Sequence, residues 1–489
     1  MNYEKLTQPH IQFSERHIGP TVEQQTYMLN YLNCNTIEDL IQETVPKNIL
    51  QKKDILQVDP CSEEEALLEL KNILNKNLIW KSYLGQGYYN THLPAVLQRN
   101  ILENPSWYTS YTPYQPEIAQ GRLEALLNYQ QMIIDLTSMD IANASLLDEA
   151  TAAAEAMTLC YRQSKTKSQK FFVDHNLHPQ SIALLKTRAE PLGINLTIGD
   201  ICFIDDNDYF GCVIQYPNTR GDITDWTDTI SNLKNNDIIV AMATDLLALG
   251  IIKPPGEMGA DIVFGSSQRF GIPLGHGGPH AAFFATKEKF KRSMPGRLIG
   301  VSKDTRGKLA YRLSLQTREQ HIRREKATSN ICTSQVLLAV LAGFYAVHHG
   351  SKGIKKIAER VHYLTKILYT GLSKQFSCNK QFFDTLTIKV GEQRNIIIDK
   401  ANLLETNLRQ LDDDHVVISI DETTTFENIV DLLIIFNIDK SDIKKILNDT
   451  YSQNIGIPKF LQRTTPFLTH EVFNAYHTCL LYTSPSPRD

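Results

Sequence analysis

Two polar residues, Asp245 and Gln268, stand where predicted strands end. Asp245 follows the apolar run DIIVAMAT, and Gln268 follows ADIVFGS by one short turn, just before a glycine-rich loop at 275–278. Ligands of open α/β sheets bind beyond the carboxyl ends of the strands. A carboxylate such as Asp245 can pair there with a protonated ring nitrogen. The plainer interpretation is that an acidic strand end and a glycine loop are routine turn features.

Two further features could bind a phosphate or a metal. Asp148 precedes an alanine-rich helix whose free N–H groups could hold a phosphate, although a plain helix N-cap is the simpler interpretation. His276 and His280 have the i, i+4 spacing of zinc ligands. Residues 277–279, Gly-Gly-Pro, disfavour a helix between them, so the two rings need not share a face. No nucleophile, metalloprotease or P-loop motif stands out.

The order of these features is more informative than any one of them. A strand, Asp245, a second strand, Gln268 and a glycine loop follow one another as in fold-type-I pyridoxal phosphate enzymes. In those enzymes a lysine, whose amine bonds covalently to the cofactor, stands at the position that Gln268 has here. A glutamine amide cannot form that bond. We therefore expect this chain alone to lack pyridoxal chemistry.

The elements that must position these residues follow from the spacing of apolar residues. Residues 20–33 and 62–78 have helical spacing, and Ser62 with Glu65 predicts a capping box at the start of the second helix. From about residue 141, short apolar runs alternate with helical segments, which indicates βαβ units around a mostly parallel sheet. Helices dominate again from 333 to 376, and a smaller α/β segment follows.

These patterns predict an α/β fold with a large domain around a mostly parallel sheet, a smaller α/β domain and a helical N-terminal segment. The predicted parts are the helical segment (1–80), the large domain (81–332), helices with the small domain (333–466), and a final segment (467–489). The basic run at 318–326 could bind an anion or an acidic partner, but a solvated helix face is the commoner meaning of such a run.

Composition narrows the classes of protein that this chain can represent. Of its 489 residues, 42% are hydrophobic and 21% are charged, which is ordinary for a globular protein, and the net charge of −4 gives no basis for nucleic-acid binding. Its eight cysteines form no CxxC pair, so we expect reduced thiols. The N-terminus shows no import signal, and the apolar run at 336–347 is too short to cross a membrane. We expect a cytoplasmic protein.

Several long segments resemble the P-protein family of the glycine cleavage system, glycine dehydrogenase (decarboxylating). They include RHIGP, LDEATAAAEAM, GADIVFGSSQRFG, GHGGPHAAFFA and REQHIRREKATSNICT, and the resemblance to the amino-terminal half of that family covers roughly residues 13–477. The family's fold-type-I halves occur in one chain or as two subunits. The resemblance implies that the second half carries the pyridoxal lysine, at the position of Gln268, and that the chain is half of an enzyme.

The resemblance also implies an activity and partners. The family decarboxylates glycine and passes the aminomethyl group to the lipoyl arm of the H-protein. We therefore expect pyridoxal 5'-phosphate to be bound through the second half, and the lipoylated H-protein, glycine and the second half or subunit to be the partners, in a dimer of full-length chains. The alternative is a fold-type-I scaffold or regulatory binding protein without the chemistry.

The resemblance nominates two groups of site residues. Residues expected near substrate and cofactor are Tyr88, Tyr89, Thr91, Tyr111 and Tyr114, for which an aromatic packing cluster is the alternative interpretation. Residues that match the lysine-free site of this half are Asp148, Asp245 and Gln268, and we expect the two aspartates to support the fold rather than touch the cofactor.

The end of the chain departs from the family pattern. Residues 467–477 resemble the start of the second half in single-chain members, which disfavours a free-standing first subunit. Residues 478–489, TCLLYTSPSPRD, have no apolar period, and their Ser-Pro repeats cannot continue a helix. We expect that the chain is truncated and that residues 478–489 are a non-native tail; the alternative is a genuine disordered terminus.

Overall fold

A computed structural model describes residues 17, 19–51, 61–108, 113, 115–204, 208–315, 335–452 and 455–476. The chain separates into two compact units, residues 1–80 and 81–489. The further boundaries predicted at 332 and 466 stay predictions. No helix in the described ranges is both long enough and apolar enough to cross a membrane.

The first unit contains three helices, α3 (Val22–Leu32), α4 (Ile37–Thr44) and α5 (Glu63–Leu74). Each begins with a reciprocal capping box, and the one predicted from Ser62 and Glu65 is confirmed: the Glu65 N–H donates to Ser62 Oγ, and the Ser62 N–H donates to Glu65 Oε2. Such caps satisfy N–H groups that a helix start otherwise leaves unpaired. None of the three helices contains a buried residue.

A seven-stranded sheet forms the centre of the second unit, in the order β2-β8-β7-β6-β5-β3-β4. Its strands are β2 (Ile141–Ala142), β3 (Lys170–Asp174), β4 (Asn195–Gly199), β5 (Gly211–Tyr216), β6 (Ile239–Thr244), β7 (Ile262–Ser266) and β8 (Ala282–Thr286). The run from β4 to β7 is parallel, and β8 joins it antiparallel. The mostly parallel sheet is therefore confirmed. Every residue of β5, β6 and β8 is buried, as expected for apolar strands covered on both faces.

The seven-stranded sheet and the helices that connect and cover its strands form the large part of this unit. These helices are α6 (Ala95–Leu97), α7 (Pro116–Thr137), α8 (Glu149–Gln163), α9 (Pro179–Ala189), α10 (Thr227–Asn235) and α11 (Pro255–Met258). The strands β9 (Leu298–Lys303) and β10 (Leu309–Ser314) form a separate antiparallel hairpin. The helix α7 begins with Pro116, and a proline at this first position has no N–H to leave unpaired.

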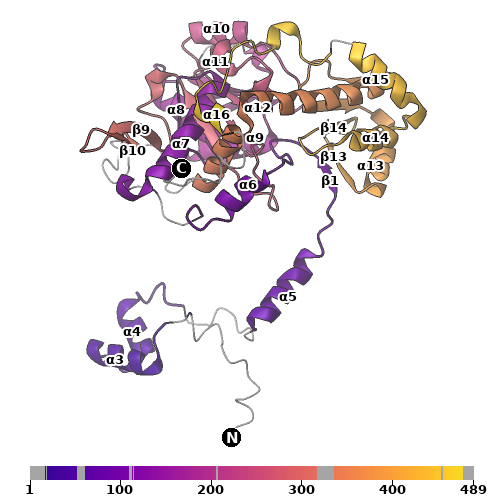
Figure 1. Ribbon diagram of the computed structural model, residues 1–489. Coiled ribbons are helices and arrows are strands. Elements are labelled where there is room, and N and C mark those ends of the chain that lie inside the picture. Colours follow the sequence, from indigo (N-terminus) through magenta and orange to yellow (C-terminus); the bar gives the residue numbers. More distant parts are fainter. Residues whose placement is uncertain are drawn as a thin grey trace. The chain divides into compact units, whose positions relative to one another are not determined.

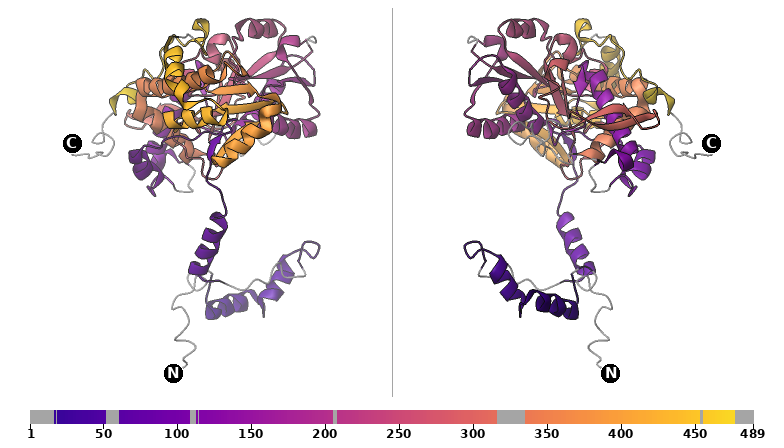
Figure 2. Two further views of the ribbon diagram at one scale, coloured as in Figure 1. Left: turned by 90° about the vertical axis from the view of Figure 1, so that its right-hand side faces the viewer. Right: turned by 90° about the vertical axis from the view of Figure 1, so that its left-hand side faces the viewer.

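A long helix, α12 (Val336–Leu372), runs from the large part to a second sheet (Figure 1). That sheet has the order β1-β13-β14-β12-β11, with bounds β1 (Lys81–Tyr83), β11 (Ser377–Cys378), β12 (Thr385–Lys389), β13 (Thr406–Gln410) and β14 (His415–Ser419). The helices near this sheet are α13 (Arg394–Leu403), α14 (Phe426–Ile435) and α15 (Ile443–Ser452). The helix α13 packs against β13, whereas α14 and α15 pack against α12 (Figure 2). Because β1 pairs with β13, residues 81–83 belong to this second sheet, which is called the small sheet below.

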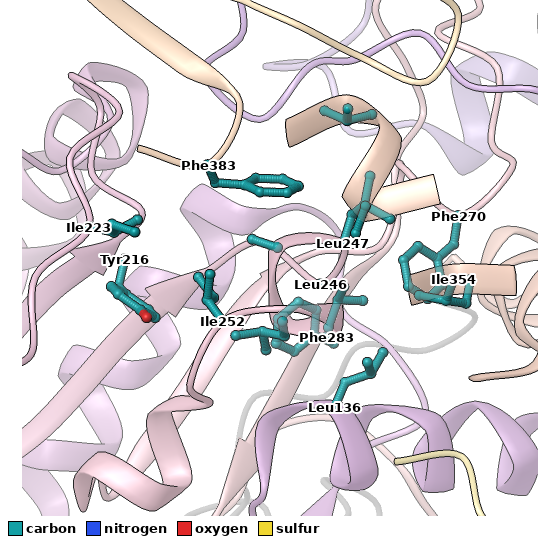
Figure 3. Close-up of a cluster of buried hydrophobic side chains, with 14 of the residues drawn as sticks. Leu136, Tyr216, Ile223, Leu246, Leu247, Ile252, Phe270, Phe283, Ile354 and Phe383 are labelled. Carbon is teal, nitrogen blue, oxygen red and sulfur yellow. The ribbon is translucent and has the colours of Figure 1, made fainter. Parts of the chain in front are cut away.

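One hydrophobic core joins the large part to the small part, which consists of the small sheet and the helices near it. Leu136 of α7, Phe283 of β8, Ile354 of α12 and Phe383 just before β12 are all buried in it (Figure 3). The last described segment, which contains α16 (Val472–Ala475), is fixed by Arg463, whose guanidinium donates to the carbonyls of Asp135, Leu136 and Leu249. A cation at the end of α7 satisfies carbonyls that the helix leaves unpaired.

Candidate functional site

Gln268 lies in the turn after β7 and is fully buried, at 0% exposure. Its Oε1 accepts the Tyr89 N–H at 3.1 Å, and its Nε2 donates to the carbonyls of Tyr89, at 2.6 Å, and Ile272, at 2.7 Å. The amide therefore uses both of its hydrogens and its oxygen on backbone groups. At the position where the sequence pattern predicts the cofactor lysine, all three polar groups of the side chain are therefore bonded within the protein.

Asp245, at the end of β6, is paired with a side chain that the sequence did not single out. Arg269 Nη1 lies 2.6 Å from Asp245 Oδ2 and 2.5 Å from Asp384 Oδ2. The Arg269 cation lies over the Tyr89 ring, with Cζ 3.8 Å from the ring centroid. Burial alone would lower the pKa of Arg269, but the two carboxylates outweigh it and raise that pKa. The carboxylate that could have met a ring nitrogen is already neutralised.

A cavity of about 30 Å³ remains between these groups and the β5 end of the sheet. That volume can hold water, since about 10–15 Å³ is enough for one water molecule. Glu149 and His178 line it, together with Gln215 and Arg409. Burial, with the nearby Asp245 charge, raises the pKa of Glu149 to about 8. Burial and the Arg409 charge lower the pKa of His178 to about 3, so this imidazole is neutral at physiological pH.

Asp148 is the N-cap of α8, with its Oδ1 accepting the Thr151 N–H at 2.7 Å. Glu149 follows in the first turn, so the helix start carries two acidic side chains. The Asp148 carboxylate would repel a phosphate there, and Glu149 places a second acidic group beside it. Gln268 has no amine that could bond to pyridoxal phosphate, and Arg269 is paired to Asp245, so the described residues of this site do not fit pyridoxal phosphate as a covalently held cofactor.

The loop at 85–91 crosses over this filled site. Gly85 (φ +66°) and Gly87 (φ +88°) both adopt the left-handed region, which lets the chain turn sharply here. A Cβ on Gly85 would stand 2.1 Å from Ser419 Oγ, so no larger residue fits at this position. The loop is therefore pressed closely against the small sheet.

The residues of this loop that the resemblance nominated point in different directions. Tyr88 is 43% exposed, and its ring centroid lies 5.0 Å from that of His280. Tyr89 is partly buried against Arg269, and burial raises its pKa well above the ordinary value. The Thr91 hydroxyl lies 2.9 Å from the Arg269 carbonyl and 2.7 Å from Glu422 Oε2, and so joins the large part to the small one. Of the three, Tyr88 alone offers its ring to the surface.

Other predicted features have separate outcomes. Tyr111, Tyr114, the basic run at 318–326 and residues 477–489 lie outside the described residues. His280 is 8% exposed, and neither of its ring nitrogens has a hydrogen-bond partner in the part of the chain that the structure describes. Within that part, no group of three or more His, Cys, Asp or Glu side chains is arranged to hold a metal.

Sequence reasoning missed the residues that fill the site: Glu149, His178, Arg269, Asp384 and Arg409. Arg269 stands next to Gln268 in the chain, and an arginine beside the missing lysine was a usable signal. Asp384 is 115 residues further along, and only the folded chain brings its carboxylate to Arg269.

Comparisons with known proteins agree with this geometry. The sequence profile of the family described as "Glycine cleavage system P-protein" matches residues 15–436. Glycine dehydrogenase (decarboxylating) of Aliivibrio fischeri (strain MJ11) is 54% identical over 470 residues, which are 96% of this chain and 49% of that protein. The chain thus spans about half the length of the curated relatives it matches.

Solved structures show the same fold. A crystal structure of glycine decarboxylase (P-protein) of the glycine cleavage system, in inhibitor-bound form, has a TM-score of 0.76 at 31% identity, over 88% of this chain and 99% of that one. An aspartate aminotransferase from Thermus thermophilus has a TM-score of 0.51 at 13% identity, over 75% of this chain and 100% of that one. The second likeness concerns the fold alone, and with the first it confirms the predicted fold type I.

Proposed function

The chain belongs to the P-protein family of the glycine cleavage system, and we propose that it is the lysine-free half of a glycine decarboxylase. In this proposal a second half supplies the lysine that holds pyridoxal phosphate, and the cofactor provides the electron sink for loss of CO2 from glycine. The remaining aminomethyl group passes to the lipoyl arm of the H-protein. The partners are that second half, glycine and the lipoylated H-protein, in a dimer of full-length chains.

The proposal rests on one observation: the Gln268 amide uses its oxygen and both of its hydrogens in hydrogen bonds within the protein. A side chain whose three hydrogen bonds all go to backbone groups is a built part of the fold, rather than an empty lysine position. The site of this half is filled by protein groups, so its contribution to the reaction has to come from its surface. This supports a division of labour in which one half binds the cofactor and the other forms a wall of the active site.

Tyr88 is the residue best placed to form that wall. The substrate glycine has no side chain that an enzyme could bind, so its orientation depends on rigid groups around it. A phenol presents a large rigid area and one directed hydrogen bond. Tyr88 is 43% exposed, and the hydrogen bond between the Tyr89 N–H and Gln268 holds its loop in place. Its hydroxyl can therefore reach a partner surface without a rearrangement of the loop. His280 lies beside the ring and supports it.

The test is complementation between halves. Residues 1–476 and the lysine-bearing second half are produced separately, and exchange of labelled CO2 into the glycine carboxyl is measured for each alone and for the mixture. We expect exchange only in the mixture. If the second half alone exchanges CO2 at the rate of the mixture, this half contributes nothing to chemistry, and the scaffold alternative replaces the proposal.

A further inference from the structure

We propose that Gln268 is a positioning residue, which fixes the 85–91 loop and thereby the direction of the exposed Tyr88 ring. The inference rests on the proposed function and deepens it, because it assigns a role in the same reaction to a residue that resemblance marks only as a lost lysine. Gln268 acts through the backbone of Tyr89, which neighbours Tyr88 in the chain.

The pattern of donors and acceptors around Gln268 admits only a primary amide. The Tyr89 N–H needs an acceptor, while the Tyr89 and Ile272 carbonyls each receive one amide hydrogen. A lysine would donate to both carbonyls and leave the Tyr89 N–H unpaired. A glutamate would accept from Tyr89 and leave at least one of the two carbonyls unpaired, because even a protonated carboxyl group has a single hydrogen to donate. Because the site is fully buried, water cannot replace the missing partner.

The rest of the loop is held by the same turn and by the small sheet. The Thr91 hydroxyl meets the Arg269 carbonyl, and the Asn90 N–H donates to Asp421 Oδ2 at 3.0 Å. Gly85 lies directly against Ser419. Between these fixed ends, Gln268 holds the one residue, Tyr89, that follows Tyr88. Loss of its two bonds to Tyr89 leaves the backbone of this residue without its hydrogen bonds to Gln268, while its ring contact with Arg269 and both ends of the loop stay in place.

The chain contains a matched control for this arrangement. Gln130, 5% exposed, makes the same two-way pair with one backbone residue: its Oε1 accepts the Ile299 N–H at 2.8 Å and its Nε2 donates to the Ile299 carbonyl at 3.1 Å. It joins α7 to β9 and does not contact the 85–91 loop. Changing Gln130 therefore removes an equivalent pair of hydrogen bonds at a place that does not hold Tyr88.

The experiment compares Gln268→Glu and Gln268→Lys with Gln130→Glu and Gln130→Lys. Amide hydrogen exchange of Tyr89 is followed in residues 1–476, and glycine-dependent CO2 exchange is followed in the full-length protein that carries this half. In the Gln268 variants we expect Tyr89 to exchange about 10- to 100-fold faster and kcat/KM for glycine to fall about tenfold. Bound cofactor should remain at the wild-type amount. The Gln130 variants should lose similar thermal stability with kcat/KM within about twofold of wild type.

Two results would overturn the proposal. One is faster Tyr89 exchange in the Gln268 variants with unchanged kcat/KM, which would make the pair structural only. The other is an equal fall of kcat/KM in both pairs of variants, which would trace the effect to general destabilisation. If a Gln268 variant does not fold, Gln268→Asn, which keeps the amide on a shorter arm, takes its place in the same comparison. Failure of the proposed function is distinct, because the wild-type full-length protein would then show no glycine-dependent exchange at all.

Discussion

Arg269 offers the sharpest test of the filled site. Its guanidinium is 5% exposed and faces Asp245 and Asp384, of which Asp384 is only 3% exposed. Replacement by methionine keeps most of the apolar stem and removes the charge, so two carboxylates are left close together without a cation. Breaking a buried pair in this way costs about 3–5 kcal/mol. We therefore expect Arg269→Met to lose about 3–5 kcal/mol of unfolding free energy at pH 7.

The loss should depend on pH in a direction that follows from the charges. Burial raises the pKa of Asp384 above the ordinary aspartate value of about 4 even in wild type, and loss of Arg269 removes a charge that lowers it. A raised folded-state pKa means that stability is retained below the unfolded-state pKa and lost as pH rises. The variant should therefore be closest to wild type near pH 4 and fall progressively behind it toward pH 7.

Urea unfolding of residues 1–476, followed by tryptophan fluorescence at several pH values, measures both effects. Arg463→Met is the control, since that guanidinium donates to the carbonyls of Asp135, Leu136 and Leu249 rather than to carboxylates. Its cost should change less between pH 4 and 7 than the cost of Arg269→Met. If Arg269→Met were as stable as wild type at pH 7, Asp245 would not be engaged by Arg269, and the filled-site account would be wrong.

Three further predictions concern the loop and the cavity. Tyr88→Phe in the full-length protein should lower CO2 exchange about tenfold, or about 1.4 kcal/mol of barrier, with bound cofactor unchanged; exchange at the wild-type rate would remove this phenol from the site. Because the folded-state pKa of Glu149 is about 8, wild type should lose stability as pH rises from about 5 to 8, and Glu149→Gln should flatten that slope in the same urea titration; equal slopes would refute the assignment. Gly85→Ala should lower the thermal midpoint far more than Gly277→Ala, because a Cβ at 85 meets Ser419 whereas one at 277 meets no atom within 4 Å, and equal midpoints would contradict this.

The fold could be predicted because its signals are local. Runs such as DIIVAMAT and ADIVFGS became β6 and β7, and the N-terminal caps were legible from residues three apart. The place of Asp245 and Gln268 at strand ends followed from the same runs. The strand β1, in contrast, could not be predicted from local signals, since its partner β13 is more than 300 residues away in the chain.

The contents of the site could not be predicted, because they depend on tertiary contacts. Linear order indicated that Gln268 replaces a lysine, and it gave no hint that the amide bonds to Tyr89, 179 residues earlier. Likewise, Tyr88 and Tyr89 are equivalent neighbours in the sequence. In the folded chain one is held on the surface and the other lies over a buried cation, so only the structure separates their roles.

The central claim is that this half is built without a cofactor lysine. It is tested most directly by reducing the full-length protein with borohydride in the presence of pyridoxal phosphate and mapping the labelled lysine by peptide mass spectrometry. The account predicts one stoichiometric label, in the second half, and none in residues 1–476. A stoichiometric label on a single lysine within residues 1–476 would contradict it.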